Sequence, residues 1–225
     1  MKYKDLLFDL DGTLLDFSAT EALSLPILFT SYGYKLTKEW LAVYNTTNKQ
    51  LWADYEAGHL CLQDVLNSRF SQTMAKLGYQ VDGVLWEDKY RELLSKGRVL
   101  INDALEVCKR LAQKYQLYIV TNGLTEMQNQ RTRDAGLADY FSGVFTSEQA
   151  GEPKPSPKFF NYIAKHILDF DSAKALIIGD SLGTDIKGGI LASIDTCWYN
   201  PNALESGDIS PTYTIASLTD LYSIL

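Results

Sequence analysis

The stretch LLFDLDGTLLD, residues 6–16, places two aspartates within an otherwise apolar run. A short apolar run of this kind predicts a buried β-strand, here over residues 6–10. A carboxylate is costly in apolar surroundings unless it is paired, hydrogen-bonded or bound to a metal ion. Asp9 and Asp11, followed at once by Gly12 and Thr13, therefore mark the place where the strand reaches the surface and where chemistry can occur.

Four further apolar runs are similar to the first, because each is short and leads into small or polar residues. They lie at residues 117–120, 144–145, 175–178 and 196–199, and segments with a helical spacing of apolar residues separate them. Strands that are apolar throughout and alternate with helices indicate a parallel sheet covered on both faces. The sequence therefore predicts an α/β fold with a Rossmann-like parallel-sheet core and helices on both faces.

Some helices of this core have recognisable ends. Thr125 and Gln128 have the spacing of a capping box, and Gly136 is expected to end the helix that they begin. Thr184 is a candidate N-cap of a later helix that carries isoleucines at helical spacing. These signals place helices between the predicted strands, as a parallel sheet requires.

Residues 17–99 differ from the rest of the chain. Apolar residues recur there at helical spacing in three stretches, which end at Gly58, at Gly78 and near Gly97. The sequence therefore predicts a core domain made of residues 1–16 and 100–225 and an all-helical cap domain made of residues 17–99. A helical insert after the first strand is expected to cover a site at the end of that strand and to exclude water from it.

The formal charge of −7 and the pI near 4.9 argue against a nucleic acid or an anionic membrane as partner, because both require a basic surface. Cys61, Cys108 and Cys197 are widely spaced and form no CxxC motif, which is typical of a reducing compartment. His59 and His166 stand alone, so neither a histidine metal site nor a histidine-based triad is expected. Without a sustained apolar segment, we expect a cytoplasmic protein, monomeric or dimeric.

Polar side chains gather at the expected carboxyl ends of the strands, which is the edge where open parallel sheets bind ligands. They are Asp9, Asp11, Thr121, Asn122, Asp180 and Asp185, joined by Lys154 from the segment GEPKPSP (151–157). Carboxylates without histidine or thiolate suit a hard cation, and Mg²⁺ prefers a few carboxylates together with water and phosphate oxygens. The sequence therefore predicts a Mg²⁺ site at this edge of the sheet.

Four segments, DLDGT (9–13), TNG (121–123), KPSP (154–157) and GDSLGTD (179–185), are similar in order and context to the four motifs of the haloacid dehalogenase (HAD) superfamily. The resemblance covers the whole predicted core, and the helical insert lies where one subgroup carries its C1-type cap. It implies a phosphomonoester hydrolase. Dehalogenating members lack a carboxylate at the position of Asp11, because a halide leaves without a proton, so Asp11 favours phosphate chemistry.

The resemblance also implies roles for the reacting residues. Asp9 would be the nucleophile that forms an aspartyl phosphate, and Asp11 would protonate the leaving alcohol and then activate water. Thr121, Asn122 and Lys154 would bind the transferring phosphoryl group, with Lys154 neutralising charge on the nucleophile and the phosphoryl oxygens.

The same resemblance implies the ligands of the metal ion. Asp9, the main-chain carbonyl of Asp11 and Asp180 would bind Mg²⁺. Asp185 would orient Lys154 or a metal-bound water.

Longer stretches bear on the substrate. TNGLTEMQNQR (121–131), YNTTNKQLWADYEAG (44–58) and TCWYNP (196–201) resemble the pyrimidine 5′-nucleotidase subgroup of the family, which implies hydrolysis of nucleoside monophosphates. Asn48 places an amide on the helical stripe of Tyr44, Trp52 and Tyr55. It is a candidate contact to the substrate, although an ordinary buried asparagine fits the pattern as well.

Other functions remain open on the sequence alone. The same site would serve a phosphatase of sugar phosphates or of phosphoglycolate, or a phosphomutase that shields its aspartyl phosphate from water. A non-catalytic HAD-like binding protein is a further alternative, and the intact set of motif residues argues against it.

Overall fold

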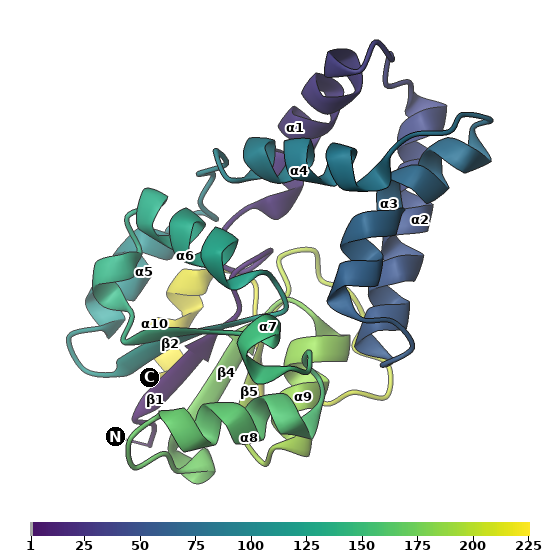
Figure 1. The fold of residues 1–225 in the computed structure, drawn as a ribbon. Coiled ribbons are helices and arrows are strands. Elements are labelled where there is room, and N and C mark those ends of the chain that lie inside the picture. Colours follow the sequence, from purple (N-terminus) through teal and green to yellow (C-terminus); the bar gives the residue numbers. More distant parts are fainter. Residues whose placement is uncertain (1) are drawn as a thin grey trace. The chain divides into compact units, whose positions relative to one another are not determined.

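The computed structural model describes residues 2–225 and divides them into two compact units. The core unit consists of residues 2–17 and 98–225, and the helical unit is Ser18–Gly97. The insert expected from the sequence ran from residue 17 to residue 99. Figure 1 shows the sheet of the core unit and the helices of both units.

All strands of the core unit form one parallel sheet in the order β3-β2-β1-β4-β5-β6. The strands are β1 (Asp5–Phe8), β2 (Gln116–Thr121), β3 (Gly143–Thr146), β4 (Ala175–Gly179), β5 (Asp195–Tyr199) and β6 (Tyr213–Ile215). The first strand of the chain is therefore central, and its two neighbours come from the second half of the sequence. The predicted α/β parallel-sheet fold is confirmed, and β6 is an edge strand that the sequence analysis missed.

The helices of the core unit lie between the strands, and the last two of them follow the last strand. They are α5 (Ala104–Leu111), α6 (Thr125–Asp134), η1 (Ala138–Tyr140), α7 (Ser147–Ala150), α8 (Pro157–His166), η2 (Ser172–Lys174), η3 (Leu182–Ile186), α9 (Lys187–Leu191), η4 (Leu218–Asp220) and α10 (Leu221–Ile224). The expectation that Thr184 caps a helix is wrong. Ser181 is the N-cap, and its hydroxyl accepts a hydrogen bond from the amide of Thr184, because the helical path already begins at Leu182.

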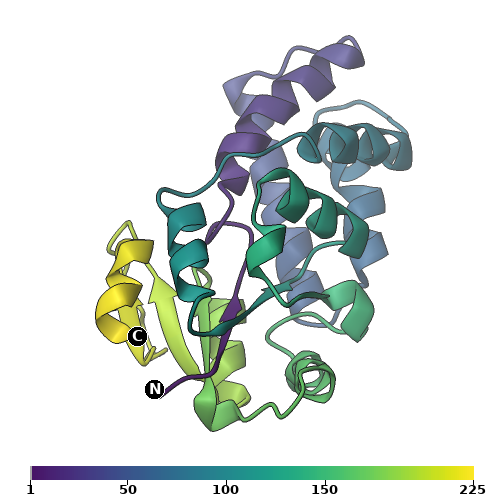
Figure 2. The same cartoon turned by 90° about the vertical axis from the view of Figure 1, so that its left-hand side faces the viewer.

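The two faces of the sheet pack against different helices because successive strand residues point to opposite sides. Leu6 and Phe8 lie in one apolar cluster with Val107 of α5 and Leu221 of α10. Leu7 lies in a second cluster with Phe159, Phe160 and Ile163, all from α8. Figures 1 and 2 show the resulting three layers of the core unit. Each fully buried side chain of this kind contributes about 1.5–3 kcal/mol.

The helical unit consists of α1 (Phe17–Ser31, whose first residue belongs to the core unit), α2 (Lys38–Glu56), α3 (Leu62–Lys76) and α4 (Gly83–Leu94). Thr37 and Asp82 cap α2 and α4 through their side-chain oxygens. The interior holds a polar pair, in which the guanidinium of Arg69 and the carboxylate of Glu87 form two contacts of 2.6 Å. The guanidinium lies over the rings of Phe70 of α3 and Tyr90 of α4, and Tyr44 of α2 stacks on Phe70.

Over residues 2–225, none of the helices combines the length and the apolar character needed to span a membrane.

The three cysteines form no disulfide in the part of the chain that the structure describes. Cys108 and Cys197 are buried, and burial raises the pKa of each thiol to about 12.

Candidate active site

The site forms where three neighbouring strands end. Phe8 of β1 is in register with Ile119 of β2 and with Ile178 of β4. Asp9 directly follows Phe8, and Asp180 comes two residues after Ile178. Thr121 is the last residue of β2. The parallel register therefore brings residues separated by more than a hundred positions to a common edge, as the sequence predicted.

Lys154 joins these strand ends. Its Nζ atom lies 2.6 Å from Asp9 Oδ1, 2.6 Å from Asp185 Oδ1 and 2.8 Å from the carbonyl oxygen of Val120. The side chain is only 2% exposed. Burial alone would lower the pKa of Lys154, but the carboxylates of Asp185 and Asp9 outweigh it and raise that pKa above its usual value. The lysine therefore places a fixed, buried positive charge beside Asp9 and Asp185.

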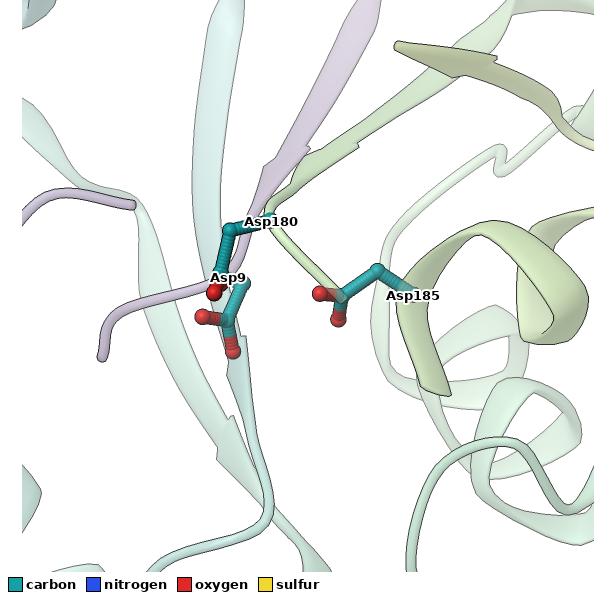
Figure 3. A group of neighbouring side chains, drawn as sticks. All are labelled: Asp9, Asp180 and Asp185. Carbon is teal, nitrogen blue, oxygen red and sulfur yellow. The ribbon is translucent and has the colours of Figure 1, made fainter. Parts of the chain in front are cut away.

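Asp9, Asp180 and Asp185 form a group of carboxylates, each of which offers one oxygen within 4.8 Å of the others (Figure 3). Burial raises the pKa of Asp180 to about 6, and the charge of Asp185 adds to this effect. One lysine does not balance three carboxylates. A divalent cation with a preference for oxygen ligands fits this donor set, because it would offset the remaining negative charge.

The three carboxylates differ in how many oxygens remain available. Both oxygens of Asp185 are engaged, one by Lys154 and the other by the amide of Ser181 at 3.1 Å. The Thr13 hydroxyl donates to Oδ1 of Asp180 at 3.1 Å, and Lys154 contacts Oδ1 of Asp9, so the side-chain contacts found within residues 2–225 leave Oδ2 of both residues available. The residues best suited to hold a cation are therefore Asp9 and Asp180, whereas Asp185 is occupied by Lys154 and Ser181.

Gly12 gives Asp180 its space. A Cβ atom at position 12 would lie 2.6 Å from Asp180 Oδ2, and the residue has a φ of +91°. Only glycine tolerates both conditions without strain. The turn after Asp11 thus requires the glycine that the DLDGT segment supplies.

Asn122 holds the loop that carries Lys154. Its Oδ1 atom accepts a hydrogen bond of 2.7 Å from the amide of Lys154, and its Nδ2 donates to the carbonyl of Lys154 at 3.0 Å. The contact expected between Asn122 and a phosphoryl group stays a prediction. The observed contacts assign this side chain to the position of Lys154.

Two residues of α6 that the sequence analysis did not assign to the site contact Asp11. Gln128 Nε2 donates to Asp11 Oδ2 at 2.7 Å, and Arg131 Nη1 lies 2.6 Å from Asp11 Oδ1. The capping box expected from Thr125 and Gln128 is wrong, because α6 begins after Leu124 without a side-chain cap and Gln128 points into the site. The available signal was a helix whose buried positions, 128, 131 and 132, are polar and share one face.

Asn48 belongs to α2 of the helical unit. Its Oδ1 atom is buried and finds no hydrogen-bond partner within residues 2–225. A buried amide oxygen of this kind is rare in folded proteins, so Asn48 remains a candidate contact.

A parallel sheet with this strand order and these carboxylates at its edge defines a class of hydrolase, and comparison with known proteins identifies it. The chain belongs to the haloacid dehalogenase-like hydrolase family, whose model matches residues 3–193. The family predicted from the four motifs and the hydrolase class are thereby confirmed.

Three relatives align with the whole chain. The putative HAD-hydrolase YfnB of Bacillus subtilis is 46% identical over 100% of this chain and 96% of its own length. The pyrimidine 5′-nucleotidase PynA of Streptococcus pneumoniae is 40% identical, with 100% and 96% covered, and the pyrimidine 5′-nucleotidase YjjG of Escherichia coli is 30% identical, with 100% and 99% covered. The predicted resemblance to this subgroup is therefore confirmed.

The solved structures agree with the sequence comparison. A crystal structure of YfnB bound to magnesium matches with a TM-score of 0.96 and 46% identity, covering 100% of this chain and 99% of that one. The fold is thus shared over the full length of both proteins.

Proposed function

We propose that this protein is a Mg²⁺-dependent phosphomonoester hydrolase that removes phosphate from nucleoside monophosphates, with pyrimidine nucleotides as the preferred class. Two relatives named pyrimidine 5′-nucleotidases, which align over the whole chain, support the substrate class. The observation that carries the reaction is the buried Lys154 ammonium 2.6 Å from Asp9, with Asp11 two residues further along the chain. A carboxylate held against a fixed positive charge is well placed to accept a phosphoryl group.

In the proposed reaction, a carboxylate oxygen of Asp9 attacks phosphorus and the bond between phosphorus and the nucleoside oxygen breaks. The electron pair of that bond goes to the nucleoside oxygen, which takes a proton from Asp11. Water then attacks the phosphorus of the aspartyl phosphate, and Asp11 accepts the proton of the water. The bond between phosphorus and the Asp9 oxygen breaks, its electron pair returns to the Asp9 carboxylate, and inorganic phosphate leaves. Lys154 and the hydroxyl of Thr121 stabilise the negative oxygens of the phosphoryl group.

Asp9, Asp180 and the main-chain carbonyl of Asp11 would hold the Mg²⁺ ion. When bound, the ion supplies positive charge against the phosphoryl oxygens and the carboxylates. The oxygens of Asp9 and Asp180 that remain available, and the space that Gly12 leaves beside Asp180, support this assignment.

We further propose that residues 17–99 act as a cap that excludes water during the reaction, and that Asn48 contacts the nucleoside. The unpartnered oxygen of Asn48 supports this role, since a base or a sugar hydroxyl could donate to it. The expected partner is therefore a small phosphorylated metabolite. The cytoplasmic location and a monomeric or dimeric state belong to the same proposal.

The test is a measurement of phosphate release from pyrimidine and purine nucleoside monophosphates, sugar phosphates and phosphoglycolate, with Mg²⁺ or with EDTA. We expect release from pyrimidine nucleotides with Mg²⁺ and none with EDTA. Release from sugar phosphates alone would contradict the nucleotidase assignment, and activity that survives EDTA would contradict the metal requirement. Asp9→Asn should abolish turnover while the thermal unfolding remains cooperative.

A further inference from the structure

Asp11 is held at both of its carboxylate oxygens by one face of α6. Oδ2 accepts a hydrogen bond of 2.7 Å from Gln128 Nε2, and Oδ1 forms an ion pair of 2.6 Å with Arg131 Nη1. The two partners are three residues apart and therefore lie on the same side of the helix. Each carboxylate oxygen has two acceptor positions, so Asp11 can still hold or take a proton while both contacts persist.

Arg131 also fixes the orientation of the Gln128 amide. Its Nη1 atom donates to Gln128 Oε1 at 2.9 Å. A guanidinium can only donate, so the oxygen of the amide must face Arg131 and the NH₂ group must face the opposite way. That NH₂ group contacts two residues of the proposed mechanism, Asp11 and Thr121, the latter at 2.9 Å.

The same contact directs the hydroxyl of Thr121. Its Oγ1 atom accepts hydrogen bonds from Gln128 Nε2 and from the amide of Gly123 at 3.3 Å. With both lone pairs engaged, the hydroxyl hydrogen is the part that remains to donate. A donor at this place matches the proposed contact to a phosphoryl oxygen. Gly123 leaves the room for it, since a Cβ there would lie 2.5 Å from Gln128 Nε2.

The surroundings of Arg131 are unfavourable for a residue whose role is to stabilise the fold. Its side chain is fully buried, yet Nε and Nη2 find no hydrogen-bond partner among the residues that the structure describes. The guanidinium lies 5.7 Å from the centre of the Phe17 ring. This cation–π contact stabilises the buried charge less than hydrogen bonds to the two nitrogens would. Burying a guanidinium with two unpaired nitrogens is unfavourable, and an apolar side chain of similar length would fill the space without this penalty.

We propose that Gln128 and Arg131 are positioning residues that hold the Asp11 carboxyl group for proton transfer to the leaving alcohol. This inference rests on the proposed phosphatase function. It assigns to α6 a role in orienting the acid and base, in addition to its packing on the sheet.

The choice of leaving group separates this role from a structural one. A nucleoside leaves as a strongly basic alkoxide and needs the proton from Asp11, whereas p-nitrophenolate is weakly basic and leaves without one. A residue that positions Asp11 for this proton transfer should therefore affect formation of the aspartyl phosphate, which kcat/KM reports, for a nucleoside monophosphate and affect it little for p-nitrophenyl phosphate. The later attack of water, in which Asp11 accepts a proton, is common to both substrates and enters kcat alone. A residue that only stabilises the fold should affect both substrates equally.

The experiment compares the full-length wild-type protein with Arg131→Met, Arg131→Lys and the control Arg133→Met, using deoxyuridine monophosphate and p-nitrophenyl phosphate with Mg²⁺. Arg131→Met should lower kcat/KM for the nucleotide by about 10- to 100-fold and change kcat/KM for p-nitrophenyl phosphate by less than about threefold. Arg133 lies on the same helix and hydrogen-bonds Gln130 at the surface, so its variant should match the wild type.

Arg131→Lys keeps a positive charge in the same place and should show a smaller loss with the same selectivity, which provides the test if the methionine variant does not fold. Equal losses of kcat/KM on both substrates, or no loss on the nucleotide, would overturn the positioning role while the phosphatase function stands. A wild-type protein that releases phosphate from neither substrate would overturn both proposals.

Discussion

The ammonium group of Lys154 lies 2.6 Å from the carboxylate of Asp9, a residue 145 positions earlier in the chain. The same nitrogen contacts Asp185 at 2.6 Å, so one buried charge joins the loop before α8 to the end of β1 and to η3. Without the lysine, the carboxylates of the site would face one another with no opposite charge between them.

Lys154→Met should therefore damage both activity and stability. We expect phosphate release to fall by about 100-fold or more and the free energy of unfolding to fall by about 3–5 kcal/mol without metal. Because the carboxylates then lack a counter-charge, Mg²⁺ should raise the melting temperature of the variant more than that of the wild type. Thermal unfolding with and without Mg²⁺ measures this difference. Lys158→Met is the control. Lys158 pairs with Glu152 on the surface, so this variant should change activity and stability little. An equal response of the melting temperature to Mg²⁺ in Lys154→Met and in the wild type would contradict the prediction.

Gly12→Ala should weaken the metal site through Asp180. The added Cβ would lie 2.6 Å from Asp180 Oδ2, so the carboxylate must move, and the positive φ adds a strain of about 1–2 kcal/mol. Gly207 also has a positive φ, but a Cβ there meets nothing within 4 Å. Titration of activity with Mg²⁺ should therefore show a higher half-saturating concentration for Gly12→Ala and an unchanged one for Gly207→Ala. If both variants need the same Mg²⁺ concentration as the wild type, Gly12 does not shape the metal site.

Asn122→Ala should lower activity by releasing the Lys154 loop. The two hydrogen bonds from the Asn122 side chain to the main chain of Lys154 are lost, and the effect on the rate should be about 10- to 100-fold, as for other residues that orient a catalytic group. Asn161 is exposed on α8, and Asn161→Ala is the matched control. Steady-state kinetics on the best nucleotide measures both variants, and a rate near that of the wild type for Asn122→Ala would remove this residue from the site.

Asp5→Asn should make the protein more stable at neutral pH. Asp5 is fully buried at the start of β1, and neither carboxylate oxygen has a hydrogen-bond partner in the region from residue 2 to residue 225. Burial raises the pKa of Asp5, with the charge of Lys4 opposing it. The folded state therefore holds the proton more tightly than the unfolded state, so the stability that Asp5 contributes is complete at low pH and is lost as the pH rises through the folded-state pKa.

The difference in the free energy of unfolding between Asp5→Asn and wild type should thus grow from low pH and level off above the pKa of Asp5. Chemical denaturation at a series of pH values measures it. Asp208→Asn, at an exposed position, is the control variant. A difference for Asp5→Asn that does not change with pH would show that the buried carboxylate finds a partner in solution.

The sequence was sufficient for the sheet and for the strand ends because the strands of this core are apolar throughout and lead directly into the catalytic motifs. The register of β1 with β2 and β4 then follows from a parallel sheet, and it brings Asp9 and Thr121 together. The short edge strand β6 was missed, since only Ile215 of its three residues is buried.

Gln128 and Arg131 were missed for a different reason. Interpretation by hydropathy assigns a polar helix face to solvent, whereas the polar face of α6 is buried against Asp11 and Thr121. The two hydrogen bonds between the Asn122 side chain and the main chain of Lys154 depend on the conformation of residues 151–156. The spacing of residues in the sequence does not predict that conformation. Asp5 was left outside the predicted strand because a charged residue is not expected in a buried strand, and the structure places it there without a hydrogen-bond partner among residues 2–225.

The central position of β1 has a consequence for synthesis of the chain. Phe8 pairs with Ile119 and Ile178, so both neighbours of the first strand leave the ribosome long after it does. At ordinary translation rates the delay before β2 is complete is on the order of ten seconds. During that time the strand that carries Asp9 has no partner in the sheet, while Ser18–Gly97 already contains its own apolar interior. The order of synthesis therefore favours folding of the helical unit first, and Asp9 gains its contact with Lys154 only when more than two thirds of the chain has been made.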